Sequence, residues 1–245
     1  MRRLIGVITI INNIAVQSFG YNKYLPLGKP EILAKNLDRW GVDEILLNVI
    51  DRSKRKLAPD FRLLELVKRQ KISTPIIYGG GINSLDNAKK VINDGADRII
   101  IESLLINNFD EVKKISNFIG SQSLIISIPL CVRNNRILQF NYLNKKKENI
   151  NKNFLEVLKH NYASEALLID YNNEGSKDGF DLSIIDKFPI QNKSLIVFGG
   201  ISSNKKIKKI FKSKIIGAAA IGNSLNYSEH RVQNIKIKNQ QYFRI

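Results

Sequence analysis

The chain has 245 residues, of which 43% are hydrophobic, so it can bury a full core, and α/β barrels of about this length commonly form one domain. Its single cysteine, Cys131, excludes an internal disulfide and a cysteine-based zinc cluster, which suits the reducing cytosol; we expect a cytoplasmic protein without metal or cofactor. The net charge of +17 raises nucleic acid as a partner, but no RNA-binding aromatic motif or zinc finger accompanies it, so we favour a solvated basic surface.

Short apolar runs alternate with amphipathic stretches along the whole chain. The runs predict strands at 4–10, 44–50, 75–78, 98–103, 124–130, 165–171, 194–198 and 218–221. Helices are predicted between them; the helix that Pro30 opens and Gly41 ends should bury Ile32, Leu33, Leu37 and Trp40. No stretch approaches the roughly 20 apolar residues of a membrane span. This order predicts an α/β fold, a (β/α)8 TIM barrel spanning residues 1–245.

Two further segments do not fit the simple alternation. Residues 14–18 look like a short excursion after the first strand, and 136–142 alternate like a hairpin strand at the barrel rim. The polar run 145–149 predicts an exposed, mobile loop. The apolar run after Met1–Arg2–Arg3 does not predict a signal peptide, because it is only eight residues long and Asn12–Asn13 ends it.

Glycine-rich turns occur twice at the end of an apolar run. Gly79–Gly80–Gly81 precedes a helix with Ser84 as its expected N-cap, and Gly199–Gly200 repeats the pattern. Glycines allow close approach of the backbone to a ligand, and the following helix offers free N–H groups, so each turn suits a phosphate. Other segments also recur at an offset of about 120 residues, which predicts half-barrel repeats of about 1–120 and 121–245.

The order of several motifs resembles the cyclase subunit of imidazole glycerol phosphate synthase over nearly the whole chain. The motifs include Val42–Asp43–Glu44, Gly79 to Ile82, Gly95 to Arg98, and Glu174 to Asp181. The resemblance implies a twofold-repeated barrel that receives ammonia from a separate glutaminase subunit, in a heterodimer, and adds it to a substrate carrying two phosphates.

The resemblance also implies roles for individual residues. A charged ring that gates ammonia at the N-terminal face corresponds to Arg3, Glu44, Arg98 and Glu165, with Arg98 where the family has lysine. The same residues could instead close the barrel floor with salt bridges, at a cost in desolvation. Asp97 corresponds to a residue at the glutaminase interface, although Gly-Ala-Asp before a strand is also an ordinary loop.

The resemblance implies two phosphate-binding sites, which we call the first and the second seat. The first corresponds to Gly81 and Ser103, and the second to the residues Gly175, Gly200, Asn223 and Ser224. Glu102 stands where the family has asparagine, and a carboxylate beside a phosphate repels it unless the carboxylate is protonated or turned away. The second seat is therefore the better supported.

The catalytic centre departs from the family. Its two aspartates, a general base and a general acid, correspond to Thr9 and Pro129, which cannot exchange protons at neutral pH unaided. A lysine that holds substrate corresponds to Gln17. Four carboxylates at strand ends offer a relocated pair, though each is more often a cap or a loop residue: Asp51, Glu102, Asp170 and Glu174.

These departures lead to one hypothesis and three alternatives. We expect an ammonia-conducting barrel subunit of a glutamine-dependent amidotransferase, with a glutaminase partner, a phosphorylated ligand at the top face, and a further sugar amidotransferase as possible recipient. This pattern is similar to divergent family members found with surface-polysaccharide genes. The alternatives are a working cyclase of histidine biosynthesis, a phosphosugar isomerase, which also needs the two lost aspartates, and a nucleic-acid binder.

Overall fold

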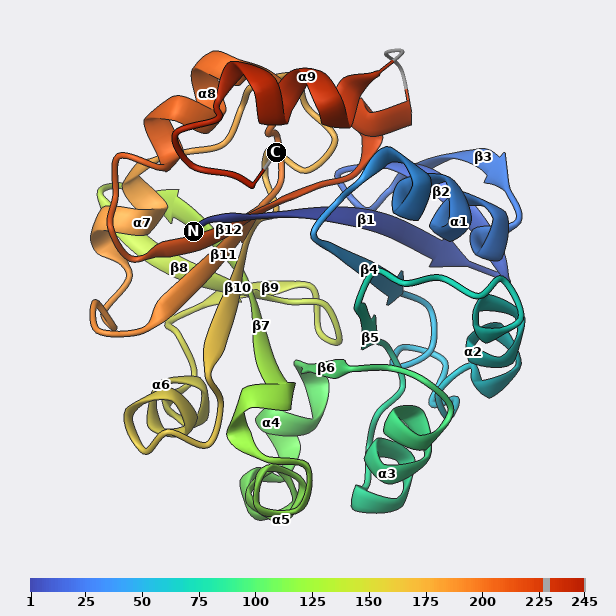
Figure 1. Ribbon diagram of the computed structural model, residues 1–245. Coiled ribbons are helices and arrows are strands. Elements are labelled where there is room, and N and C mark those ends of the chain that lie inside the picture. Colours follow the sequence, from blue (N-terminus) through green and yellow to red (C-terminus); the bar gives the residue numbers. More distant parts are fainter. Residues whose placement is uncertain (227–229, 245) are drawn as a thin grey trace.

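The computed structural model describes residues 1–226 and 230–244, and it forms a closed parallel barrel with helices around it (Figure 1). The strands follow the order β1-β4-β5-β6-β7-β10-β11-β12, and β12 pairs in parallel with β1, which closes the ring. The predicted (β/α)8 barrel is confirmed. The barrel strands are β1 (Arg3–Ile11), β4 (Glu44–Val49), β5 (Ile76–Gly79), β6 (Arg98–Ile101), β7 (Leu124–Arg133), β10 (Glu165–Asp170), β11 (Ser194–Phe198) and β12 (Ile216–Ile221).

Helices cover the outside of the barrel. They are α1 (Pro30–Trp40), α2 (Phe61–Lys68), α3 (Leu85–Asn93), α4 (Ser103–Asn107), α5 (Phe109–Ile119), α6 (Lys152–Lys159), α7 (Ser183–Lys187), α8 (Asn204–Ile210) and α9 (Arg231–Lys238), with short 3₁₀ turns η1 (Ser121–Ser123) and η2 (Asn223–Asn226).

The helix ends follow the sequence signals. Pro30 occupies the first turn of α1, and Gly41 ends that helix in the left-handed region with φ 82°. The Ser84 hydroxyl accepts a hydrogen bond from the Asn87 N–H at 3.2 Å, so Ser84 caps α3 as predicted. The local signals therefore fix where these crossovers begin and end.

The core has two parts that the barrel wall separates. One part lies between the strands and the surrounding helices and includes Leu37, Leu64, Val91, Ile115 and Phe154. The other fills the barrel interior with inward-facing side chains of alternate strand positions, among them Ile5, Leu46, Ile77, Ile125 and Ile196. The interior is thus lined by apolar side chains over its middle.

Two antiparallel hairpins sit on the barrel; the predicted rim strand is confirmed, and the other segments depart from the prediction. The expected excursion at 14–18 is a strand, β2 (Ile14–Phe19), which pairs with β1 and with β3 (Lys23–Gly28). The expected rim strand is β8 (Arg136–Asn141), which pairs with β7 and with β9 (Lys146–Glu148). The prediction that 145–149 is wholly a loop was wrong, because backbone pairing with β8 orders residues whose side chains remain exposed. Each hairpin follows the first strand of a predicted half, although the half-barrel repeat itself stays a prediction.

Some apolar residues assigned to buried faces are exposed. Ile32 is 44% exposed and Trp40 36%, whereas Ala34 and Leu37 are buried. Successive helical residues lie about 100° apart, so Ile32 and Leu33 cannot both face the barrel. The buried stripe of α1 is narrower than the sequence pattern indicated.

Candidate functional site

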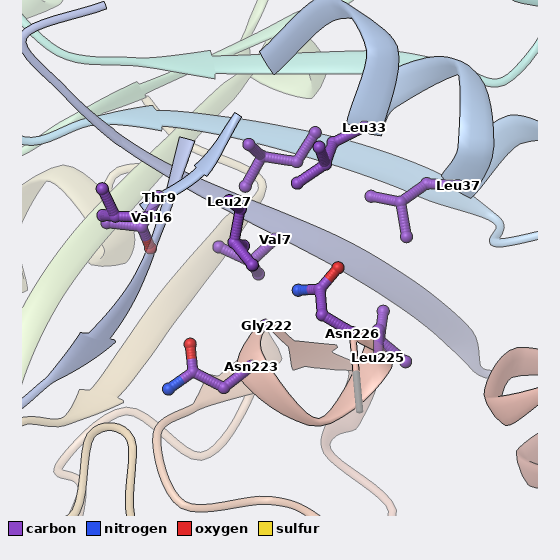
Figure 2. A pocket seen from close by; sticks show the side chains of 11 residues that line it. Val7, Thr9, Val16, Leu27, Leu33, Leu37, Gly222, Asn223, Leu225 and Asn226 are labelled. Carbon is purple, nitrogen blue, oxygen red and sulfur yellow. The ribbon is translucent and has the colours of Figure 1, made fainter. Parts of the chain in front are cut away.

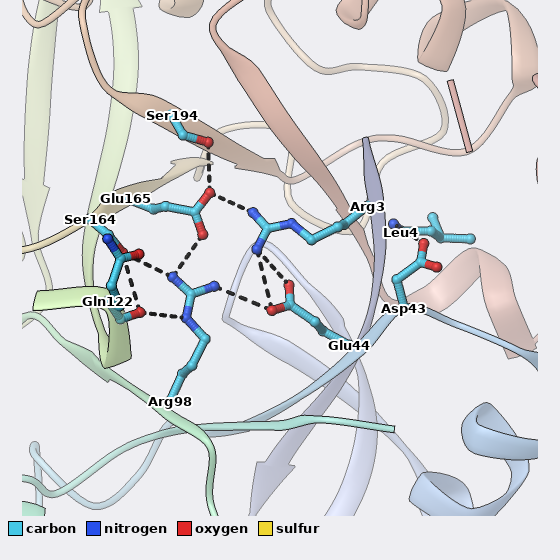
Figure 3. Close-up of polar contacts among 9 residues, drawn as sticks. All are labelled: Arg3, Leu4, Asp43, Glu44, Arg98, Gln122, Ser164, Glu165 and Ser194. Atoms are coloured by element: carbon cyan, nitrogen blue, oxygen red, sulfur yellow. Dashed lines mark hydrogen bonds and ion pairs between the residues drawn. The ribbon is translucent and has the colours of Figure 1, made fainter. Parts of the chain in front are cut away.

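A closed ring of four charged side chains spans the N-terminal end of the barrel (Figure 3). Each comes from the first residue of a barrel strand: Arg3 from β1, Glu44 from β4, Arg98 from β6 and Glu165 from β10. Arg3 contacts the carboxylates of Glu165 at 2.5 Å and Glu44 at 3.3 Å, and Arg98 contacts the same carboxylates at 2.7 and 3.3 Å. The structure therefore brings all four predicted gate residues together, with no net charge.

The two carboxylates of the ring have different surroundings. Glu165 also accepts a hydrogen bond from the Ser194 hydroxyl at 2.7 Å. Its pKa is lowered, because the attraction of both arginines outweighs the effect of burial. Burial instead raises the pKa of Glu44, whose arginine contacts are longer. Glu165 is the more firmly ionised member, so the ring depends on it most.

The ring forms the floor of an open depression on the N-terminal face. This depression has a volume of about 670 Å³ and is bordered by the starts of several strands and by residues of the loops 121–122 and 161–164. Arg98 also donates to the Gln122 carbonyl at 3.1 Å and to the Ser164 hydroxyl at 3.2 Å, which ties the ring to those loops. The apolar barrel interior lies directly above the ring.

Asp97, predicted at a partner interface, is exposed beside this face and has a structural contact. Its carboxylate accepts a hydrogen bond from the Ile76 N–H at 2.7 Å. Asp43 makes the same type of contact with the Leu4 N–H, also at 2.7 Å. Both aspartates thus satisfy a backbone donor at a strand start, and an interface role for Asp97 stays a prediction.

The two positions of the family's aspartates lie at the other end of the barrel. Thr9 is buried on β1 and lines a pocket of about 10 Å³ between β2, α1 and η2 (Figure 2). Pro129 lies on β7 beside Ile169 of β10. Neither side chain carries a proton that exchanges near neutral pH, so acid-base chemistry at this end requires another group.

Glu102 is the carboxylate that enters this end of the barrel. It follows β6 and accepts a hydrogen bond from the hydroxyl of Ser127, which lies two residues before Pro129 on β7, at 3.0 Å. Burial raises the pKa of Glu102 to about 8, against the smaller opposing effect of that hydrogen bond. Glu102 is therefore mostly protonated at pH 7, which removes the charge repulsion expected beside a phosphate.

The other three carboxylates considered at the rim hold loops. Asp51 pairs with Arg55 at 3.1 Å, and Asp170 accepts hydrogen bonds from the backbone N–H groups of Asn173 and Asp181. Glu174 accepts hydrogen bonds from the Ser18 hydroxyl and the Tyr21 N–H. Each of the three is thus engaged in local contacts, and a relocated pair of catalytic carboxylates stays a prediction.

A cavity of about 430 Å³ opens beside Glu102 at the carboxyl ends of β4 to β7. Gly79–Gly80–Gly81 and Ser103 line one side, and aromatic residues of β8 and the strand ends line the other. Phe140 stacks on Tyr171 with ring centres 4.3 Å apart, and Tyr142 meets Tyr21 edge-on at 5.4 Å. The first predicted phosphate seat thus borders a cavity of the size that small ligands occupy.

Two members of the second predicted seat, Gly175 and Asn223, lie against β2. A Cβ atom on Gly175 would lie 2.3 Å from the Ser18 carbonyl oxygen, and one on Gly200 would lie 2.8 Å from the Asn173 carbonyl oxygen. The Asn223 amide bonds both backbone groups of Ser18. The Ser224 hydroxyl is buried without a hydrogen-bond partner among the described residues.

Sequence reasoning missed the aromatic wall and Ser127. Phe140 and Tyr142 alternate along a rim strand, and that alternation was a usable signal that both side chains point to one face. Ser127 gave no such signal, because it is a small polar residue inside an apolar run.

The class of protein is an α/β barrel with a charged ring at one end and, at the other, glycine turns and a ligand-sized cavity. The structure's described residues include no helix able to cross a membrane. The family model of the histidine biosynthesis protein matches residues 3–231. The chain therefore belongs to the histidine biosynthesis protein family.

Individual relatives agree with this assignment. A Vibrio vulnificus protein named "Putative imidazole glycerol phosphate synthase subunit hisF2" is 26% identical over 230 residues, covering 93% of this chain and 83% of the relative. The imidazole glycerol phosphate synthase subunit HisF of Pyrococcus furiosus is 28% identical over 247 residues, covering 96% and 94% of the two chains. Both matches cover more than nine tenths of this chain.

Proposed function

We propose that this chain is the ammonia-receiving barrel subunit of a glutamine-dependent amidotransferase. A glutaminase subunit docks over the depression on the N-terminal face, and ammonia enters the barrel where the ring of Arg3, Glu44, Arg98 and Glu165 parts. A phosphate-bearing ligand binds at the opposite end, above the strand ends. The single observation behind this proposal is the ring at the floor of an open depression.

A purely structural role, closing the barrel floor, does not explain well why the ring is built from charged residues. Two carboxylates with exposed side-chain fractions of 8% and 7% lose most of their hydration here, and apolar residues of similar size would close a barrel floor at lower cost. Charged groups that exchange partners can open and reclose, which apolar packing does not do readily. A gate is therefore the better explanation of these residues.

The acceptor of the ammonia is proposed from the upper end of the barrel. Thr9 and Pro129 cannot act as the family's acid and base, so the ammonia leaves for a further enzyme, a sugar amidotransferase of surface-polysaccharide biosynthesis. This assignment rests on the resemblance to divergent family members. It predicts that the chain lacks cyclase activity of its own.

The test is co-expression with a glutaminase subunit from the same genome, followed by affinity purification at low salt. We expect a one-to-one complex and a rise in glutamine hydrolysis on complex formation. Arg98→Glu, which places a third carboxylate in the ring, should weaken the complex or its glutaminase activity, whereas Arg69→Glu, at the exposed residue just after α2, should not. Failure of the unaltered chain to retain any co-expressed glutaminase would sink the proposal.

A second candidate function is a working cyclase of histidine biosynthesis, and one observation favours it. Glu102 and Ser127 provide a protonated carboxyl and a hydroxyl at the upper end, where the family's chemistry occurs. Complementation of a histidine auxotroph that lacks the cyclase subunit separates the two functions. Growth that requires Glu102 would support the cyclase.

A further inference from the structure

The positive charge of the chain is concentrated in its last quarter. Residues 187–245 contain twelve lysines and arginines and one acidic residue, which gives a net +11 of the total +17. The other 186 residues carry only +6. Figure 1 shows this stretch, which includes β11, α8, β12 and α9, along one side of the barrel in orange and red. The charge is therefore a local property of that side.

Several of these cations gather at the N-terminal end of the barrel. Lys193 directly precedes β11 and borders the depression over the charged ring. Lys212 and Lys214 are exposed in the loop before β12. The Arg2 guanidinium donates to the Lys214 carbonyl at 2.9 Å, which joins the N-terminus to that loop. Because strand starts share one end of a barrel, these four residues lie together beside the depression.

These cations lack acidic partners within the chain. Among the residues that the structure describes, none of the four pairs with a carboxylate, whereas Lys90 and Lys113 elsewhere each pair with one three or four residues away. The exposed Asp97 precedes β6, which stands opposite β12 in the ring of strands. The N-terminal face thus has a basic side and an acidic residue across from it, and such a field orients an approaching partner.

Large apolar side chains are exposed at the same side of the face. Met1 is 86% exposed, Ile237 59% and Trp40 36%. The Gln233 side chain donates to the Trp40 carbonyl at 3.1 Å, and Ile237 lies one turn further along that face of α9. Arg244 donates to the Met1 sulfur at 3.2 Å. The ends of α1 and α9 and the two chain termini therefore meet here.

We call the ends of α1 and α9, the loop 211–215 and residues 1–2 the basic edge. Exposed apolar side chains that are bordered by charge are typical of protein interfaces, where Trp, Met and Arg are enriched. The edge is continuous with the depression, which Met1 and Lys193 both border. A protein partner fits this composition better than RNA, whose phosphates need only the cations.

We propose that the basic edge fixes the orientation of the partner subunit on the N-terminal face, and that the partner meets it with acidic side chains around an apolar contact at Trp40 and Ile237. This rests on the proposed function, which places a glutaminase on that face, and adds the position and the charge of the contact. The ring of two arginines and two glutamates has no net charge, so it does not orient a partner over long distances. The edge attracts the acidic side of the partner, and the apolar residues then hold it.

The test is stopped-flow association of the full chain with a glutaminase subunit from the same genome. Between about 0.05 and about 0.5 M NaCl, we expect the association rate to fall at least tenfold, because salt screens the attraction. Lys212→Glu combined with Lys214→Glu should slow association about tenfold at low salt. Lys23→Glu combined with Lys146→Glu makes the same charge change on the exposed hairpins at the opposite end, and it should change the rate less than about twofold.

The apolar contact has its own comparison. Ile237→Ser should raise the dissociation rate about fivefold or more, whereas Leu25→Ser, at a 46% exposed residue of β3, should leave it unchanged. Phe118, 61% exposed at the end of α5, is the competing apolar contact. A complex weakened by Phe118→Ser and not by Ile237→Ser would overturn the proposal.

Two further results would also overturn it. One is an association rate that neither salt nor the Lys212 and Lys214 changes affect; such a complex would leave the proposed function standing. The other is a generic RNA that displaces the glutaminase at physiological salt, which would assign the edge to nucleic acid. Absence of any complex with the unaltered chain would refute both this proposal and the proposed function.

Discussion

Replacing Glu165 by glutamine removes one charge from the ring while keeping its shape. Glu165 contacts Arg3 at 2.5 Å, Arg98 at 2.7 Å and Ser194 at 2.7 Å, so the change leaves two arginines facing Glu44 alone. Breaking a buried ion pair costs about 3–5 kcal/mol. The Arg3 side chain is 30% exposed, and hydration recovers part of that loss, so we expect about 3 kcal/mol.

Chemical and thermal denaturation at pH 7 measure this loss. For a domain of this size, about 3 kcal/mol lowers Tm by roughly 6–12 °C. Glu44→Gln should cost less, about 1 kcal/mol, because its arginine contacts are both 3.3 Å and burial already raises its pKa. Glu65→Gln is the control: its pair with Arg69 has both side chains more than half exposed, so the cost should stay below about 0.5 kcal/mol.

The order of the three variants decides whether the reasoning is sound. A Glu165→Gln protein no less stable than Glu65→Gln would show that the ring carries no net electrostatic stabilisation. A Glu44→Gln protein less stable than Glu165→Gln would show that the difference assigned to the two carboxylates is wrong.

Three further predictions follow from the upper end of the barrel. The pKa of Glu102 is about 8 in the folded chain and near 4.5 in the unfolded chain, so this group's contribution to stability falls as pH rises from about 4.5 to 8. In urea denaturation, Glu102→Gln should therefore be about 1–3 kcal/mol more stable than the unaltered protein at pH 9 and should flatten this pH dependence. An unchanged pH profile would refute the burial of Glu102. Gly80→Ala should destabilise the protein by more than about 3 kcal/mol, since the added Cβ would lie 2.2 Å from the Val49 carbonyl oxygen. Gly120 also has a positive φ but has open space around it, so Gly120→Ala should cost only about 1 kcal/mol. Equal Tm values for the two variants would contradict this. The unaltered chain should fail to rescue a cyclase-deficient histidine auxotroph, and growth on medium without histidine would reverse the interpretation of Thr9 and Pro129.

The features that could be predicted from the sequence are those carried by short-range signals. Apolar runs gave the barrel strands, and the prolines, glycines and Ser84 gave the helix ends, because each acts within a few residues. The four ring residues came from the family resemblance; each stands at the start of a strand, and the closed barrel brings these strand starts together.

The features that could not be predicted depend on contacts between distant segments. The pairing of Ser18 with Asn223 joins positions 205 residues apart, and nothing near either residue indicates that β2 contacts η2. The sequence favoured the second phosphate seat because Glu102 stands beside the first, and which seat holds a phosphate stays a prediction. The state of Glu102 also escaped prediction, because its pKa depends on burial that only the assembled barrel creates.

Amide hydrogen exchange of this chain, with and without its glutaminase partner, tests the central claim most directly. The account predicts that binding slows exchange at the N-terminal face, in peptides that include the ring and the loops 121–122 and 161–164. Peptides around Gly81 and Gly175, at the opposite end, should exchange at unchanged rates. Protection confined to that opposite end, or no protection at any partner concentration, would contradict the account.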